Sequence, residues 1–343
     1  MPLQEDEWEA KDESFISVRI SEFYSPRQVA FDLSLKLGDG RYLKVFRAGE
    51  NFNEAELKNY EIDRGVRYVY FARENRQTYI KSSAAILSKI AGIAAIPIKT
   101  KFAMARIFSE LYIQELLQCS DDDRPALVEQ GKTLCSLLAG WIENEPALMP
   151  FLLNLEHTDP TIESLSFLTG MFASALSRRF PWKSVRTTEN LLLASFLSDV
   201  GIAALPPEVA KLKPKRMTTA QRKQFEKHPE LSYLLLEDLG ILHENVLTIV
   251  RQHHEYSDGT GYPNKITGEK TLMLSKLVSL SGDIVRASSD FLLPPCEAAK
   301  MLIPELSKKA FTSHPEQVAK YDKDLLTKFF ELFEKESVEG AAA

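Results

Sequence analysis

The sequence contains little cysteine and no secretion signal. Only three cysteines occur among its 343 residues, and no two of them form a CxxC pair. Neither a disulfide framework nor a thiolate zinc site is therefore expected, and a reducing compartment fits best. The first 14 residues carry six acidic side chains against a single lysine and lack the basic and apolar regions of a secretory signal. These absences predict a cytoplasmic protein.

Long apolar runs and an excess of positive charge are also missing. The most apolar segment, residues 84–96, is interrupted by Ser88 and Lys89, whereas a membrane-spanning helix needs about 20 apolar residues. We expect this segment to form a buried helix, and we expect no membrane span. The 42 lysines and arginines are outnumbered by 48 acidic residues, which argues against binding of duplex nucleic acid through overall phosphate neutralisation.

The residues that are present, 44% hydrophobic and 26% charged, are those of an ordinary globular protein. Apolar alternation on both sides of Gly38-Asp39-Gly40 predicts a β-hairpin over residues 31–46. A helix is expected over 53–60 and a further strand over 66–71. The basic and aromatic residues of this region either form a platform for an anionic ligand or partner, or lie solvated on the outer face of a sheet.

Helical spacing replaces strand spacing after Ser82 and continues almost to the end of the chain. The predicted fold class is an α+β N-terminal domain followed by an all-α domain, mostly α overall. The expected segments are a flexible acidic tail (1–14), a small α+β sensor or interaction domain (15–81), connecting helices (82–150), the all-α domain (151–335) and a C-terminal tail (336–343).

Histidines are scarce, six in all, yet His253 and His254 are adjacent. Adjacent residues of a helix point about 100° apart, so these two reach one metal only near a helix end, or else they serve different metals. The other candidate ligands are Asp199, His228 and Asp283, and imidazoles combined with carboxylates suit iron, manganese or zinc. Taken singly, each has a plain structural interpretation: a helix-terminal aspartate, a surface histidine, or a buried hydrogen-bonding carboxylate.

Four short segments in a fixed order carry a family resemblance. They read LSDVGI over 197–202, HP over 228–229, HHEYSDGTGYP over 253–263 and LSGD over 280–283. In order and spacing they resemble the HD-GYP family, a subclass of the HD superfamily. The resemblance runs from about residue 160 to about residue 333, about half of the chain.

The resemblance implies an all-helical domain that uses two or three divalent metal ions, usually iron or manganese, to hydrolyse cyclic di-GMP. Neighbouring metals clamp the phosphodiester and lower the pKa of a bridging water. By position, Asp199 corresponds to a bridging aspartate, the three histidines complete one metal, and Asp283 belongs to the neighbouring metal. The implied metal ligands are Asp199, His228, His253, His254 and Asp283, and the loop that shapes the site and is associated with protein contacts includes Asp258, Gly259, Gly261, Tyr262 and Pro263.

Several departures from the family pattern concern ligands and phosphate contacts. Ser198 stands in place of the histidine of the HD pair, and Ile202 in place of a phosphate-contacting lysine. Upstream, Ser164 stands where the family has a further histidine ligand. His157, a few residues earlier, is a weak candidate to replace that ligand. Residues 287–295 are acidic or apolar where the family has a basic stretch. The departures imply fewer metal ions than in typical members, with enough ligands for one.

Three functions are compatible with this pattern. The first is a degenerate HD-GYP protein of bacterial cyclic di-GMP signalling, with weak or no phosphodiesterase activity. It would bind cyclic di-GMP or a related nucleotide, or a protein partner through the Gly261-Tyr262-Pro263 loop. The alternative is a metal-dependent cyclic di-GMP phosphodiesterase with an atypical metal site, in which Asp199 is catalytic. The second alternative is a structural or regulatory domain that binds another nucleotide.

Overall fold

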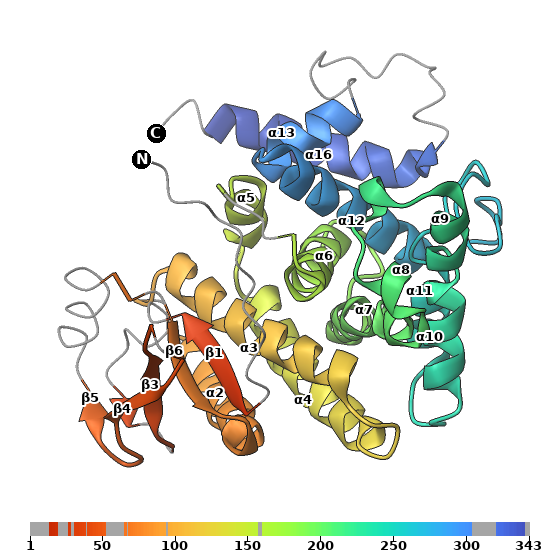
Figure 1. Ribbon diagram of the computed structural model, residues 1–343. Coiled ribbons are helices and arrows are strands. Elements are labelled where there is room, and N and C mark those ends of the chain that lie inside the picture. Colours follow the sequence, from red (N-terminus) through yellow and green to blue (C-terminus); the bar gives the residue numbers. More distant parts are fainter. Residues whose placement is uncertain are drawn as a thin grey trace, which may run out of the picture. The chain divides into compact units, whose positions relative to one another are not determined.

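The computed structural model describes residues 14–19, 27–28, 31–38, 40–52, 65–66, 68–93, 95–156, 160–303 and 320–339. Two compact units, Met1–Ile90 and Ala91–Ala343, make up the chain (Figure 1). The helix expected over 53–60 and residues 1–13 of the predicted acidic tail lie outside the described residues. The boundary between the units falls beyond residue 81, where we expected it, because helix α2 (Arg76–Ala91) packs with the strands.

The first unit contains an antiparallel sheet of four strands in the order β1-β6-β3-β4 (Figure 1). The strands are β1 (Phe15–Arg19), β2 (Arg27–Gln28), β3 (Leu33–Lys36), β4 (Tyr42–Phe46), β5 (Asn51–Phe52) and β6 (Tyr68–Ala72), of which β2 and β5 pair separately. The predicted hairpin is confirmed, since β3 pairs with β4 and Leu35 lies opposite Leu43. Gly40 in its turn adopts φ +82°, a conformation that glycine reaches without strain.

Alternate residues of β1 and β6 are buried, which gives the sheet a covered face. Leu33, Val69 and Phe71 are fully excluded from solvent. The ring of Tyr79 in α2 stacks on that of Phe71, with centroids 4.9 Å apart, so α2 covers this face. The 3-10 turn η3 (Arg73–Asn75) leads from β6 directly into α2. The role of this unit as a sensor or interaction module stays a prediction.

The apolar segment 84–96 is helical only as far as Ala91, where α2 ends. Within the segment, Leu87 is the only described side chain that is buried, and Ile93 is 45% exposed. The expectation of a buried helix is wrong here, because α2 turns a single face to the sheet and most of the apolar run stays in contact with water. No helix among the described residues is long and apolar enough to cross a membrane.

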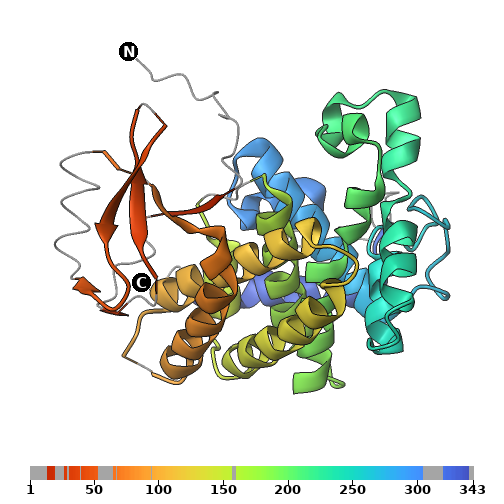
Figure 2. The same ribbon diagram turned by 60° about the horizontal axis from the view of Figure 1, so that its bottom comes forward.

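The second unit is helical, which confirms the predicted all-α architecture (Figure 1 and Figure 2). Its helices are α3 (Ile98–Gln118), α4 (Arg124–Glu143), α5 (Leu148–Leu153), α6 (Ile162–Ser177), α7 (Val185–Leu197), η4 (Val200–Ala204), α8 (Pro207–Ala210), η5 (Pro214–Arg216), α9 (Thr219–Phe225), α10 (His228–Glu237), α11 (Glu244–Gln252), α12 (Met273–Phe291), α13 (Pro295–Leu302) and α16 (Lys323–Glu339). The central helix α6 is buried on nearly all sides and packs against α3, α7 and α12.

Two boundaries differ from the expected ones. Helices α3 and α4, which we expected to be connecting helices, pack against α6 and α7 and so belong to the core of the second unit. Helix α16 continues to Glu339, past the predicted end of the domain at residue 335. The first difference arises because apolar faces of α3 and α4 find partners within the unit, which sequence spacing alone does not reveal.

Candidate metal centre

The turn after α7 holds Asp199 against the start of α10. Gly201 makes this possible, because a Cβ at this position would lie 2.4 Å from the amide nitrogen of Ser232 and 2.5 Å from the carbonyl oxygen of His228. The N–H of Gly201 donates to Ser232 Oγ (2.8 Å), and Ser232 Oγ donates to the carbonyl oxygen of Ser198 (2.7 Å). These bonds fix the position of Asp199 relative to His228, the first residue of α10.

His253 and His254 follow the end of α11. The helix ends at Gln252, and His253 is its C-cap residue, so the expectation that both histidines lie near a helix end is confirmed. The hydroxyl of Ser279 in α12 lies within hydrogen-bond distance of the carbonyl oxygens of His253 (3.0 Å) and Glu255 (3.1 Å), which share its one proton with the carbonyl oxygen of Ser275 (2.9 Å). This segment is therefore anchored to α12 as well as to α11.

Two histidine rings face each other with their Nε2 atoms. His228 Nδ1 lies 2.7 Å from the carbonyl oxygen of Phe225, and His253 Nδ1 lies 2.7 Å from that of Val250. A carbonyl only accepts, so each Nδ1 carries the proton and each Nε2 of a neutral ring presents a lone pair. The two Nε2 atoms are 3.2 Å apart. Two facing lone pairs at this distance repel unless a cation lies beside them.

Burial keeps all three histidines neutral. His228, His253 and His254 are 0%, 5% and 7% exposed, and desolvation of the charged form lowers their pKa values. For His253 the pKa falls to about 3, with a further lowering by neighbouring His228. For His228 the negative charge of Asp199 opposes the shift without cancelling it. Neutral imidazole is the form that binds a metal ion.

Three of the four candidate ligands converge, and the fourth, Asp199, lies against one of them. The ligand atoms of His228, His253 and His254, called here the three-histidine cluster, all lie within 4.8 Å of one another. Asp199 Oδ1 is 3.3 Å from His228 Nε2, and Asp199 Oδ2 accepts a hydrogen bond from Ser166 Oγ (3.2 Å). Three imidazole nitrogens and one carboxylate oxygen fit a divalent metal ion such as iron, manganese or zinc. No second such group occurs in the part of the chain that the structure describes.

Asp283, which we expected among the ligands of a neighbouring metal, is instead surrounded by hydrogen-bond donors. Its Oδ1 accepts from Tyr256 (3.0 Å) and Arg286 (2.8 Å), and its Oδ2 accepts from Lys320 (2.7 Å) and Tyr321 (2.7 Å). Burial alone would raise the pKa of Asp283, but the charges of the two cations hold it below its ordinary value. We call these five residues the Asp283 cluster. Both carboxylate oxygens are already engaged.

The loop after the histidines folds back over them. Gly261 lies so close to the chain that a Cβ would be 2.5 Å from the carbonyl oxygen of His254, and the Tyr262 ring stacks on that of His254 with centroids 4.5 Å apart. The buried carboxylate of Glu255 accepts the backbone N–H groups of Asn264 (2.6 Å) and Ile266 (3.1 Å). Glu255 thus fixes the far side of the loop. The Tyr262-Pro263 peptide bond is cis.

Asp258 and Gly259 form an exposed turn beside this loop. Asp258 Oδ1 accepts from the N–H (2.9 Å) and the hydroxyl (2.7 Å) of Thr260, and Gly259 adopts φ +74°. The Asp258 oxygen is used within the turn, which is the plain structural interpretation of this pair.

The side chains at the positions that depart from the family pattern make contacts outside the three-histidine cluster. Ser198 Oγ donates to the carbonyl oxygen of Ala194 (2.6 Å), and Ile202 packs in an apolar cluster of η4 and α8. Ser164 Oγ accepts from Arg106 of α3 (3.2 Å). Ser166, two residues later and therefore on another side of α6, is the serine that reaches Asp199. His157 lies outside the described residues.

Sequence reasoning missed Ser166, Arg286 and Lys320. Arg286 could have been noticed, because it follows Asp283 by three residues on a helix, a spacing that brings side chains together. For the upstream position, the sequence pattern points to Ser164, whereas the serine that contacts Asp199 is Ser166, two residues later. Lys320 lies 37 residues from Asp283, and no local pattern connects them.

The second unit is similar to known proteins in sequence. Residues 153–287 match the family model of the HD domain. Over 125 residues the chain is 30% identical to the cyclic di-GMP phosphodiesterase response regulator RpfG of Xanthomonas campestris, a match that covers 36% of this chain and 32% of that protein. Over 85 residues it is 31% identical to the cyclic di-GMP phosphodiesterase PA4108 of Pseudomonas aeruginosa, covering 25% of this chain and 20% of that protein.

A solved structure has the same fold over nearly the whole length. It is Bd1817, an HDG"Y"P protein from Bdellovibrio bacteriovorus, with a TM-score of 0.69 at 20% identity over 93% of this chain and 99% of that one. The chain contains an HD-GYP domain. The match to the HD family starts at residue 153, in α5, and ends in α12. The chain spans about a third or less of the length of the two curated relatives.

Proposed function

We propose that the HD-GYP domain binds one divalent metal ion, iron or manganese, through the three-histidine cluster and Asp199. We further propose that it acts in cyclic di-GMP signalling by binding the nucleotide or a protein partner, with weak or absent hydrolysis. The observation that carries the metal site is the pair of facing Nε2 atoms of His228 and His253, 3.2 Å apart. Only a cation between or beside them turns this repulsive contact into a favourable one.

The residues of the site have separate tasks in this proposal. A bound metal ion supplies Lewis-acid chemistry, polarising a phosphate oxygen and lowering the pKa of a bound water. Asp199 is held by the Ser166 hydroxyl, which fixes its carboxylate toward the cluster. The two Nδ1–H groups that donate to backbone carbonyls fix the ring orientations of His228 and His253. Tyr262 covers His254 and limits access of water from that side.

Weak hydrolysis is expected because Asp283 offers no free carboxylate oxygen for a second metal ion and the chain has no lysine at position 202. Both oxygens of Asp283 are engaged by four donors, and the side chain of Ile202 is apolar and buried. One metal ion activates a nucleophile but does not also hold the leaving oxygen, which a two-metal site does. The relatives RpfG and PA4108 are named as cyclic di-GMP phosphodiesterases, and the similarity to them favours the alternative, a working phosphodiesterase.

Metal content tests the ligand assignment. The purified chain, loaded anaerobically with iron(II) or manganese(II) and desalted, is expected to retain about one metal ion per chain by elemental analysis. His253→Gln removes one ligand and is expected to lower metal content and melting temperature together. His243→Asn is the matched control, because His243 is an exposed helix N-cap outside the cluster and asparagine also caps helices. Equal metal content in both variants would contradict the assignment.

Incubation with cyclic di-GMP tests the activity. The metal-loaded chain is expected to bind the nucleotide in a titration and to release little linear dinucleotide or GMP, while an active family member run in parallel hydrolyses it. Product that disappears in His253→Gln would establish the phosphodiesterase alternative. Absence of binding to cyclic di-GMP, with the metal retained, would favour a different nucleotide.

A further inference from the structure

The Asp283 cluster holds more positive than negative charge. One carboxylate, that of Asp283, is shared by the guanidinium of Arg286 (2.8 Å) and the ammonium of Lys320 (2.7 Å). The other two partners, Tyr256 and Tyr321, donate their hydroxyl protons to Asp283 (3.0 Å and 2.7 Å). They therefore stay neutral. Two cations against one anion leave the cluster with a surplus of one positive charge.

Both cations are attached to the segment that carries the histidines. Ser279 and Arg286 lie seven residues apart on α12 and so share a face, and Ser279 Oγ lies within hydrogen-bond distance of the carbonyl oxygen of His253. From the other side, the N–H of Ser257 donates to the carbonyl oxygen of Lys320 (2.9 Å). The surplus charge thus lies next to the three-histidine cluster.

The cations are accessible, whereas the carboxylate is not. The side chains of Arg286 and Lys320 are 36% and 30% exposed, and that of Asp283 is 11% exposed. A guanidinium has five N–H donors and an ammonium three, and Asp283 takes one from each. Lys320 Nζ also lies 3.9 Å from the centre of the Tyr256 ring, which fixes its position. Both partly exposed cations therefore have N–H donors beyond those that Asp283 takes.

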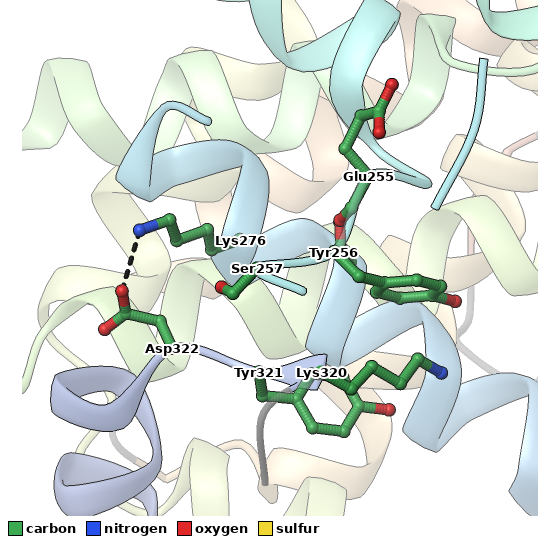
Figure 3. A pocket seen from close by; sticks show the side chains of 8 residues that line it. Glu255, Tyr256, Ser257, Lys276, Lys320, Tyr321 and Asp322 are labelled. Carbon is green, nitrogen blue, oxygen red and sulfur yellow. Dashed lines mark hydrogen bonds and ion pairs between the residues drawn. The ribbon is translucent and has the colours of Figure 1, made fainter. Parts of the chain in front are cut away.

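A small recess borders the cluster, lined by Tyr256, Lys320 and Tyr321 together with Glu255, Lys276 and Asp322. In Figure 3 the polar ends of Tyr256, Lys320 and Tyr321 point to one side of it, and the ion pair of Lys276 with Asp322 lies on the other side. Lys276 is neutralised by this single partner at 2.7 Å and is mostly buried. It therefore contributes no surplus charge, and the accessible positive charge is that of Arg286 and Lys320.

We propose that Arg286 and Lys320 form a phosphate-binding subsite beside the metal centre, in which fixed protein cations hold a phosphate group of the nucleotide. Its use for cyclic di-GMP rests on the function proposed above. Arginine suits this task, because its planar fork meets two phosphate oxygens at once. Asp283 acts as a positioning residue that holds both cations at a fixed place. The subsite accounts for phosphate affinity in a domain without a basic stretch after Asp283.

Inorganic phosphate tests the subsite without the nucleotide. Binding to the native state raises the melting temperature, so metal-free wild-type chain is expected to melt higher in sodium phosphate than in sodium chloride of equal ionic strength. Arg286→Gln and Lys320→Gln are each expected to lose most of this difference. Lys328→Gln removes the same charge from α16 at a residue paired with Glu331, and it is expected to keep the difference. No phosphate effect in the wild type, or an equal one in all four proteins, overturns the subsite.

Cyclic di-GMP tests the use of the subsite. Loss of a charge-assisted hydrogen bond to phosphate is expected to raise the dissociation constant for cyclic di-GMP about tenfold in manganese-loaded Arg286→Gln and Lys320→Gln. Lys328→Gln is expected to leave it unchanged. Equal affinity in all four proteins overturns the subsite while leaving the proposed function intact. A phosphate effect without any cyclic di-GMP binding supports the subsite and contradicts the nucleotide named in the proposed function.

Two further measurements separate binding from folding. Metal content is expected to stay unchanged in both variants, because neither residue is placed among the ligands, and a loss of metal would overturn the assignment. If Arg286→Gln does not fold, Arg286→Lys keeps a cation beside Asp283 and loses only the planar guanidinium fork that meets two phosphate oxygens at once. That variant is expected to fold and to bind phosphate more weakly than the wild type, and wild-type phosphate affinity would contradict a role for the fork.

Discussion

Acid is expected to destabilise the metal-free HD-GYP domain through its buried histidines. His253 has a pKa of about 3 in the folded chain against an ordinary value of 6.5. The unfolded chain therefore binds more protons than the folded chain between these two pH values, and stability falls as the pH falls. The contribution of the neutral ring is fully present above pH 6.5 and is lost progressively toward pH 3.

The size of the effect follows from the two pKa values. One pKa unit corresponds to about 1.36 kcal/mol, and protonation of the unfolded state between pH 7.5 and pH 5.0 amounts to about 1.5 such units. We expect His253 alone to remove about 2 kcal/mol from the free energy of unfolding over this interval. The figure changes little if the folded pKa is one unit higher, because the folded ring is still neutral at pH 5.0.

The assay is urea unfolding of chelator-treated protein at pH 7.5 and pH 5.0, followed by the fluorescence of Trp141, which is buried in α4. Wild type and His253→Gln are compared, so that titration of other groups cancels. The wild type is expected to lose about 2 kcal/mol more than the variant between the two pH values. Equal losses in the two proteins would refute the reasoning, because they would mean that His253 is not held neutral by burial.

Three substitutions test the packing of the site. Gly261→Ala forces a Cβ into the backbone of the histidine segment and is expected to cost about 1–3 kcal/mol, measured by urea unfolding. Gly201→Ala pushes α10 from the Asp199 turn and is expected to lower metal affinity as well as stability, whereas Gly140→Ala, where a Cβ meets nothing within 4 Å, leaves both unchanged or raises stability. Ile202→Lys buries a charge in the apolar cluster of η4 and α8 and is expected to lower the melting temperature without increasing hydrolysis.

The sequence predicts the parts of this protein that depend on local patterns. The hairpin around Gly40, the helical second unit, and the position of His253 at a helix end all follow from short-range spacing and turn chemistry. The prediction that the apolar run 84–96 is buried is wrong, because burial does not follow from a local pattern. Burial depends on which partner covers a helix face, and nothing within the run itself specifies that partner.

The sequence predicts which histidines come together, but not what surrounds them. The facing Nε2 atoms require the hydrogen bonds of Phe225 and Val250, which any backbone carbonyl could supply and which leave no mark in the sequence. The contact of Asp283 with Lys320 joins residues far apart in the chain. Motif spacing places Asp283 next to the histidines but does not reveal that cations already surround it.

The two clusters differ in what each still needs. His228 and His253 are buried and neutral with opposed lone pairs, an arrangement that weakens the fold unless a cation binds. The Asp283 cluster instead has a surplus of positive charge, because the charges of Arg286 and Lys320 together exceed that of Asp283 and both side chains are partly exposed. A metal ion satisfies the first cluster and an anion satisfies the second. Since both clusters are attached to the segment after α11, the two proposals together place a phosphate group bound to the cations beside a metal ion bound to the histidines.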